Sequence, residues 1–166
     1  MTTSHVKPLL KFIAPLLLAC AYSSPLLAEP LECVNSLFKY VDEFPIDKLG
    51  AKIDVKLTQE PNVHGKAGEV IKTSTYSSGE NWISIRKCAS CDPEESRAGA
   101  YIVASQPLPC GLKKGMTVPQ ITKILGEAPG KQGNELLIYG VGDDMTDEVI
   151  IHLVNGKLEG LLNTYY

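Results

Sequence analysis

The feature that most constrains the fold is a short helix marked at both ends and followed by three strands. Thr117 is a residue type that caps a helix, Pro119 suits the first helical turn, and Gly126 suits the C-terminal end. Asn155-Gly156 is a dipeptide typical of a two-residue hairpin turn, because both residues tolerate positive φ. We therefore expect a helix from Thr117 to Gly126 and a three-stranded antiparallel meander after it.

The remaining hydrophobic patterns predict one more helix and several strands. An apolar stripe at helical spacing predicts a helix over 31–43. Alternation predicts a half-buried strand over 51–58, with Ile53, Val55 and Leu57 on the buried side. Further strands are expected at 69–76, 81–88, 99–105, 135–141, 147–154 and 157–165.

These elements predict an α+β protein in which short helices pack on an antiparallel sheet. Residues 44–50 faintly resemble residues 118–126. The α+β protein could therefore consist of two tandem helix-sheet units that arose by duplication. The alternative is two similar α+β halves without a shared repeat. The expected organisation is a leader at 1–28, an N-terminal α+β region at 29–107, and the helix and β-meander at 108–166.

Residues 1–28 have the pattern of a secretory signal peptide. Lys7 and Lys11 make the start basic, an apolar run too short to span a bilayer follows, and Ala28 suits cleavage before Glu29. We therefore expect a periplasmic or secreted protein. Removal of the leader would leave 14 basic and 19 acidic residues, a net charge of −5. This charge argues against a nucleic-acid partner, which requires concentrated Lys and Arg.

Two other forms of the mature N-terminus stay open. Ala19-Cys20-Ala21 also fits the small-residue rule for cleavage, which would then follow Ala21. The stretch 17–20 resembles a bacterial lipobox, in which Cys20 would be lipidated. In that case the protein would be an outer-membrane lipoprotein, and the lipid would be its attachment to the membrane.

Four cysteines remain in every case, because Cys20 is either removed or lipidated. An even number in an exported chain predicts disulfides, and Cys33, Cys88, Cys91 and Cys110 allow three pairings among which the sequence does not choose. A bridge from Cys33 to Cys110 would stabilise the fold by roughly 4 kcal/mol in the chain-entropy model. Two other uses stay open, namely redox exchange by Cys88 and Cys91 and zinc held by four thiolates.

Four residues are candidate contacts for a partner. Trp82, the single tryptophan, fits either the core or an exposed aromatic anchor. Asp143, Asp144 and Asp147 lie in an acidic hairpin tip, which fits either a solvated loop or a contact site for a basic partner. The chain has no Gly-x-Ser-x-Gly, His-Glu-x-x-His or P-loop motif, and apart from the cysteine alternatives above we expect no catalytic residue, metal site or cofactor.

Several motifs of the C-terminal half resemble a known family. Gly115–Thr117, Leu125–Pro129 and Tyr139–Gly140 resemble the “GMT…lGxP…Y” signature of the BamE-like (SmpA/OmlA) bacterial envelope proteins, although Ala128 is an extra residue inside Gly-x-Pro. The resemblance covers about residues 112–165. It implies a non-enzymatic scaffold that works by protein–protein contact. The β-lactamase inhibitory proteins have a similar architecture and the same Gly-Met-Thr opening, which implies an inhibitor as an alternative.

We therefore predict an exported envelope protein that binds another envelope protein in a scaffold or accessory role, without catalysis. Two alternatives stay open. One is an inhibitor or immunity protein that blocks an enzyme with a hairpin loop. The other is a thiol-disulfide exchange enzyme that uses Cys88 and Cys91.

Overall fold

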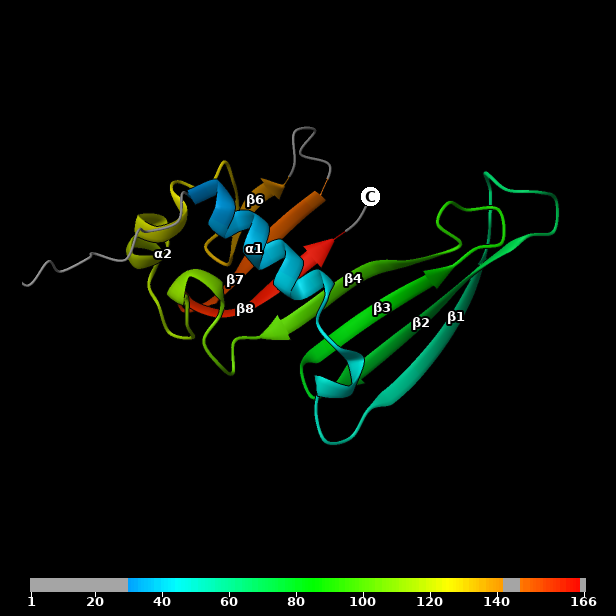
Figure 1. Ribbon diagram of the computed structural model, residues 1–166, viewed down its shortest axis with the longest axis horizontal. Helices are drawn as coiled ribbons and strands as arrows, with labels where there is room; N and C mark the ends of the chain where they lie inside the picture. The colour runs from blue at the N-terminus through cyan, green and yellow to red at the C-terminus, as the bar shows by residue number, and fades with distance from the viewer. Residues whose placement is uncertain (1–29, 142–146, 165–166) are drawn as a thin grey trace, which may run out of the picture.

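A computed structural model describes residues 30–141 and 147–164 (Figure 1). In this part of the chain the helices are α1 (Pro30–Asp42) and α2 (Val118–Leu125), and the short 3-10 turns are η1 (Ile46–Lys48) and η2 (Pro109–Gly111). The strands are β1 (Asp54–Pro61), β2 (Val70–Ser78), β3 (Asn81–Lys87), β4 (Glu95–Val103), β5 (Gly130–Gln132), β6 (Leu136–Val141), β7 (Asp147–Val154) and β8 (Lys157–Thr164).

The strands form one antiparallel sheet in the order β1-β2-β3-β4-β8-β7-β6-β5. The prediction of an α+β fold is therefore wrong, because the described chain is mostly one large sheet accompanied by two short α-helices. The arrangement in tandem helix-sheet units is wrong for the same reason. The pairing of β4 with β8 makes a single sheet out of strands from both halves of the chain.

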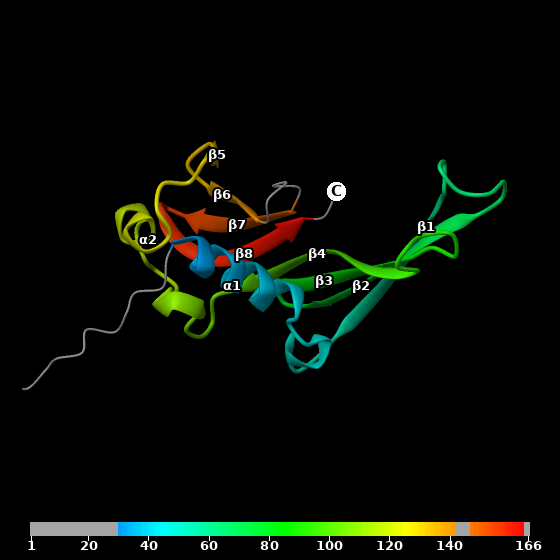
Figure 2. The ribbon, with the colours of Figure 1, turned by 45° about the horizontal axis from the view of Figure 1, so that its top comes forward.

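Helix α1 covers one face of this sheet, which we call the near face; the opposite face is the far face (Figures 1 and 2). Helical spacing places Val34, Leu37 and Val41 on one side of α1, where all three are buried. Arg97 in β4 fixes the end of the helix. Its guanidinium donates to the Val41 carbonyl at 2.8 Å and to the Phe44 carbonyl at 3.1 Å, and so ties β4 to the last turn of α1 and to the segment that follows the helix.

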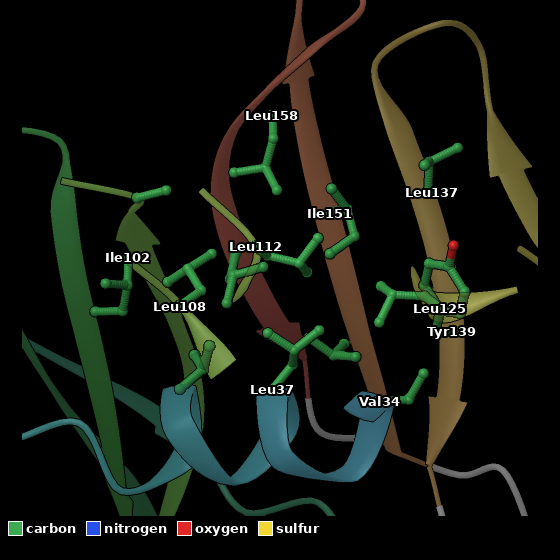
Figure 3. Packing of buried hydrophobic residues seen from close by; sticks show 14 of the residues in the cluster. Val34, Leu37, Ile102, Leu108, Leu112, Leu125, Leu137, Tyr139, Ile151 and Leu158 are labelled. Carbon is green, nitrogen blue, oxygen red and sulfur yellow. The ribbon is translucent and has the colours of Figure 1, made fainter. Parts of the chain in front are cut away.

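The core lies between α1 and the near face (Figure 3). Ile102, Leu161, Ile151 and Leu137 are directly opposed on the neighbouring strands β4, β8, β7 and β6, and all four are buried. Because opposed residues of an antiparallel sheet point to the same face, this row makes a continuous apolar floor under the helix. The core therefore joins strands from both halves of the chain.

The C-terminal helix and the final turn form where their residues predict them. The Thr117 N–H donates to Gln120 Oε1 at 2.9 Å before α2, and Gly126 ends the helix with φ of 77°. Asn155 and Gly156 join β7 to β8 with φ of 53° and 71°, as a two-residue turn requires. These local predictions are confirmed, although the fold class to which they were assigned is wrong.

Strands β1, β2 and β3, with the first part of β4, extend beyond α1 as an arm (Figures 1 and 2). Every residue of β1 is exposed, and Val55 and Leu57 are 54% and 73% exposed. The prediction of a half-buried strand is therefore wrong here. The side chains do alternate, but α1 contacts the sheet at β4, β8, β7 and β6 and does not reach β1.

The prediction of disulfides is confirmed, with bridges between Cys33 and Cys110 and between Cys88 and Cys91. The first bridge joins α1 to η2 across 77 residues of sequence. The second lies within the loop between β3 and β4, at the outer end of the arm. Because all four sulfurs are in disulfides, none is free as a thiolate to bind zinc, which argues against the zinc hypothesis.

Candidate functional site

Two aromatic side chains lie next to each other on the far face. Trp82 in β3 is directly opposite Tyr101 in β4. A Cβ atom at Gly99 would lie 3.3 Å from the Trp82 ring, and one at Gly160 would lie 2.8 Å from Cζ of Tyr101 and from its hydroxyl oxygen. Each ring therefore lies across a glycine of the adjacent strand. The glycines hold both rings flat against the sheet and leave one side of each ring facing outward.

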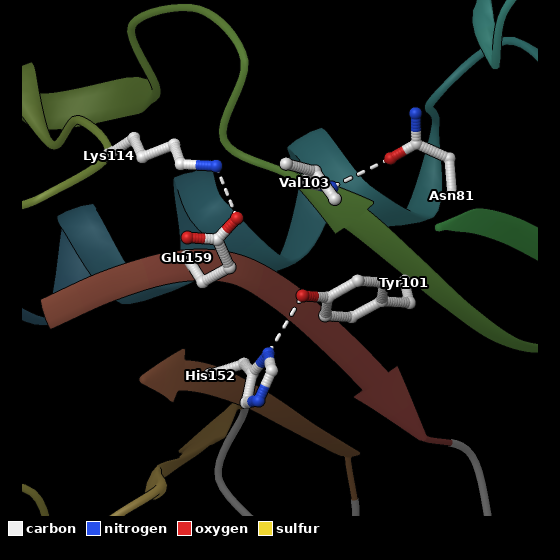
Figure 4. A network of polar contacts seen from close by, with 6 residues as sticks. All are labelled: Asn81, Tyr101, Val103, Lys114, His152 and Glu159. Atoms are coloured by element: carbon white, nitrogen blue, oxygen red, sulfur yellow. Dashed lines mark hydrogen bonds and ion pairs between the residues drawn. The ribbon is translucent and has the colours of Figure 1, made fainter. Parts of the chain in front are cut away.

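The Tyr101 hydroxyl reaches across β8 to His152 in β7 (Figure 4). The hydroxyl oxygen and Nδ1 of His152 are 2.7 Å apart, and the two rings meet edge to face with centroids 5.5 Å apart. Helix α1 lies behind the strands in this view. Burial raises the pKa of Tyr101, with smaller contributions from Glu159 and Glu80, so the phenol is neutral at physiological pH.

These side chains form one side of an open depression of about 540 Å³. Two carboxylates, Glu80 and Glu159, contribute to its lining, and Lys114 forms an ion pair with Glu159. Val154, which is 45% exposed, adds an aliphatic surface. The full lining consists of Glu80, Trp82, Tyr101, His152, Val154 and Glu159. The lining therefore combines aromatic and aliphatic side chains with two carboxylates, one of which is paired with a lysine.

An aliphatic band continues from the aromatic pair across the far face. Leu162 lies opposite Tyr101, Ile150 lies opposite Leu162, and Ile138 lies opposite Ile150. Within the described residues no helix covers these side chains, because α1 packs on the other face. Ile150 is itself buried, and Leu162 and Ile138 are half-buried, so the accessible apolar surface of the far face is mainly that of Trp82, Tyr101 and Val154. Accessible aromatic and aliphatic side chains bordered by charged residues are typical of a protein-binding face.

The structure separates the residues that were predicted to contact a partner. Trp82 lies on the far face, as its alternation with Ile83 indicated. Asp147 lies opposite Val141, which packs against the core, and so it belongs to the near face. Asp143 and Asp144 lie outside the described residues. The four residues therefore do not form one site in the part of the chain that the structure describes.

The sequence did not reveal Tyr101, the Gly160 beneath it, or the Gly99 beneath Trp82. One signal was present in the sequence. Trp82 shares one face of its strand with Ser84, whereas the apolar Ile83 and Ile85 lie on the other face. A large aromatic among small polar residues indicates a sheet face without a covering layer. Tyr101 and Gly160 carry no such signal, because their proximity depends on the pairing of β4 with β8.

A second polar cluster joins the two loops at the outer end of the arm. The Glu69 carboxylate accepts from Ser90 Oγ at 2.6 Å, from Ser90 N–H at 2.7 Å and from Lys66 N–H at 3.0 Å. Asn62 Nδ2 donates to the same carboxylate at 3.3 Å. These bonds, with the Ser90 hydroxyl first, hold the pKa of Glu69 below its usual range.

The Cys88–Cys91 bridge belongs to the second of these loops. Cys88 is buried, and Cys91 is half-buried. Residues 92–94, which follow the pair, are not helical, and β4 begins at Glu95. The pair therefore does not lie at a helix N-terminus, which is the feature that lowers the thiol pKa in Cys-x-x-Cys oxidoreductases.

The remaining predicted features concern the N-terminus, and they lie outside the described residues: the leader 1–28, cleavage between Ala28 and Glu29, and lipidation at Cys20. In residues 30–141 and 147–164, no three or more His, Cys, Asp or Glu side chains are grouped so that they could hold a metal ion. In the same residues, no helix has both the length and the apolar character needed to cross a membrane.

Comparisons of this chain with models of protein families, with curated proteins and with solved structures found no match. The function proposed below rests on the geometry of the far face and on the sequence patterns described above.

Proposed function

We propose that this protein is an exported bacterial envelope protein that binds another envelope protein through the far face of its sheet, without catalysis. The observation that supports this most directly is the uncovered pair Trp82 and Tyr101, each held across a glycine. Tryptophan and tyrosine are enriched among the residues that dominate binding energies. Rings that are already fixed lose little conformational freedom when a partner covers them.

The chemistry around the rings defines the class of partner segment. Glu80 places negative charge in the lining beside the rings, the charge of Glu159 is offset by its ion pair with Lys114, and the aromatic faces attract cations. A segment that presents Lys or Arg among apolar side chains would satisfy both features. The expected net charge of −5 for the mature chain would steer a basic surface toward this protein.

The proposed location rests on independent features of the chain. The basic and apolar leader supports export, and the two disulfides support an oxidising compartment. The resemblance of residues 112–165 to the BamE-like family supports a scaffold or accessory role at the envelope. A lipid on Cys20 would make the protein an outer-membrane lipoprotein, and mass spectrometry of the mature N-terminus distinguishes this form from cleavage before Glu29.

Photo-crosslinking in the bacterial envelope tests the proposed surface. A photoreactive phenylalanine analogue replaces Val154, which lines the depression, and in a matched control it replaces Lys39, an exposed residue of α1. We expect a product with one envelope protein from position 154 and none from position 39. Excess unlabelled protein should suppress this product, and excess Trp82→Ala protein should not. Equal products from both positions, or none from position 154, would contradict the proposal.

The arm favours a second candidate, an inhibitor or immunity protein that inserts its outer loops into the cleft of an enzyme. The loops are joined through Glu69 and stiffened by the Cys88–Cys91 bridge. Val63 projects from them and is 82% exposed as a residue. The same photoreactive group at position 63 separates the two candidates. The inhibitor hypothesis requires the product at position 63, whereas the far-face proposal requires it at position 154.

A further inference from the structure

We infer that β1 pairs in antiparallel orientation with β1 of a second copy of this chain, so that two eight-stranded sheets become one continuous sheet. The strand is the outermost one of the sheet, and all eight of its residues are exposed. Among the described residues, Figure 1 shows no other element along its outer side. An exposed strand at a sheet edge is a template for another strand, because one row of its N–H and C=O groups is unpaired.

The hairpin register shows which backbone groups are free. The Asn62 N–H donates to the Glu69 carbonyl at 2.9 Å, directly beyond the last strand pair, Pro61 with Val70. Hydrogen-bonded pairs alternate along an antiparallel ladder, so the even-numbered residues of β1 bond to β2. Val55, Leu57 and Gln59 therefore direct their N–H and C=O groups outward. Pro61 offers only its carbonyl.

The charges on β1 distinguish the three symmetric registers that are centred on Lys56, Leu57 and Thr58 near the middle of the strand. Centring the pair on Lys56 would place Lys56 opposite Lys56 of the second copy, and centring it on Leu57 would place Asp54 opposite Glu60. Centring on Thr58 places Lys56 opposite Glu60 of the second copy, and the two-fold symmetry makes this pair twice. Like charges directly opposite each other are destabilising and opposite charges stabilising, so the register centred on Thr58 is favoured.

Backbone and side chains agree in this register. Leu57 meets Gln59 of the second copy at a hydrogen-bonded position, which uses outward groups on both strands. Val55 and Leu57, exposed on the near face, gain cover from the second strand. Lys56 and Glu60 meet at a non-hydrogen-bonded position, where side chains approach most closely. Within its own sheet Lys56 lies opposite Thr75 and Glu60 lies opposite Ile71, so neither faces an opposite charge there.

Sedimentation equilibrium of the full mature protein at low ionic strength tests this pairing. We expect a monomer–dimer equilibrium for the wild type. Lys56→Glu or Glu60→Lys alone should raise the dissociation constant about tenfold, because each change makes two like-charge pairs. The double variant K56E/E60K should return to within about threefold of the wild type. Lys123→Glu on α2, which changes the net charge by the same amount as Lys56→Glu, should have no effect.

A backbone variant provides a second readout. Leu57→Pro removes an outward N–H without removing a bond to β2, so the monomer should fold and the dimer should be lost. A circular dichroism spectrum like that of the wild type verifies folding. A wild type that is monomeric at all concentrations would overturn the inference. The inference would also be overturned if the β1 substitutions left the dissociation constant unchanged, or if the double variant dimerised as weakly as the single variants.

Discussion

Replacing both Cys33 and Cys110 with alanine would release α1 from η2, and the resulting loss of stability can be estimated from the structure. In the chain-entropy model a disulfide stabilises the fold by restricting the unfolded chain, and the effect grows with the length of the closed loop. Cys33 and Cys110 are 77 residues apart, whereas Cys88 and Cys91 are 3 residues apart. The two bridges therefore offer an internal comparison.

The loop lengths give different expected losses. For the long loop the model gives about 4.5 kcal/mol, and for the short loop it gives about 1.6 kcal/mol. A domain of this size is typically stable by about 5–15 kcal/mol, so C33A/C110A would remove a large part of the total. The loss of the buried Cys33 sulfur from the core adds to this effect. C88A/C91A affects the arm end and should leave the core packed.

Urea unfolding, followed by far-UV circular dichroism and by the fluorescence of Trp82, measures both losses. We expect C33A/C110A to lower the free energy of unfolding by at least about 2 kcal/mol more than C88A/C91A does. A variant C33A/C110A that is already unfolded without urea would agree with the estimate. Equal losses for the two variants, or a loss below about 1 kcal/mol for C33A/C110A, would refute the reasoning.

Three further predictions address the far face, the core and the arm. Gly160→Ala should cost about 1–3 kcal/mol in urea unfolding, because its Cβ would lie 2.8 Å from Tyr101 and from the Ile102 carbonyl oxygen; an unchanged stability would contradict the close packing. Leu37→Ala should cost about 2–5 kcal/mol in the same assay, because Leu37 is fully buried under α1; a loss below about 1 kcal/mol would contradict the core assignment. Glu69 has a pKa lowered from its ordinary value of 4.5, so its stabilising bonds are present above that pH and are lost as pH falls through the lowered pKa. Amide exchange at Ser90 should therefore lose protection in acid, and E69Q should show less protection at neutral pH and little dependence on pH; equal profiles for both proteins would contradict this role.

Local structure was predictable where particular residues mark the ends of an element. Thr117 and Gly126 delimit α2, and Asn155-Gly156 fixes the β7–β8 turn, because these residues act over a few positions of sequence. The strand alternation at Val55 was also correct as a pattern. It indicates which side chains share a face, but it does not indicate whether anything covers that face.

The fold class and the site depend on contacts between distant residues. The pairing of β4 with β8 brings Ile102 beside Leu161 and unites the two halves in one sheet, and no short motif encodes it. The same pairing places Gly160 under Tyr101 and allows the hydroxyl to reach His152. Trp82 was identifiable from its alternation, whereas its partners became visible only with the register of the strands.

The most direct test of the far-face proposal uses Trp82 itself, since the chain has a single tryptophan. The mature protein is labelled with 5-fluorotryptophan and titrated with the envelope protein that is crosslinked to position 154. We expect the ¹⁹F resonance to shift or broaden as the complex forms, and Glu80→Lys to weaken binding by reversing one of the charges beside it. Formation of the complex with a resonance that keeps its position and width would contradict binding at the far face.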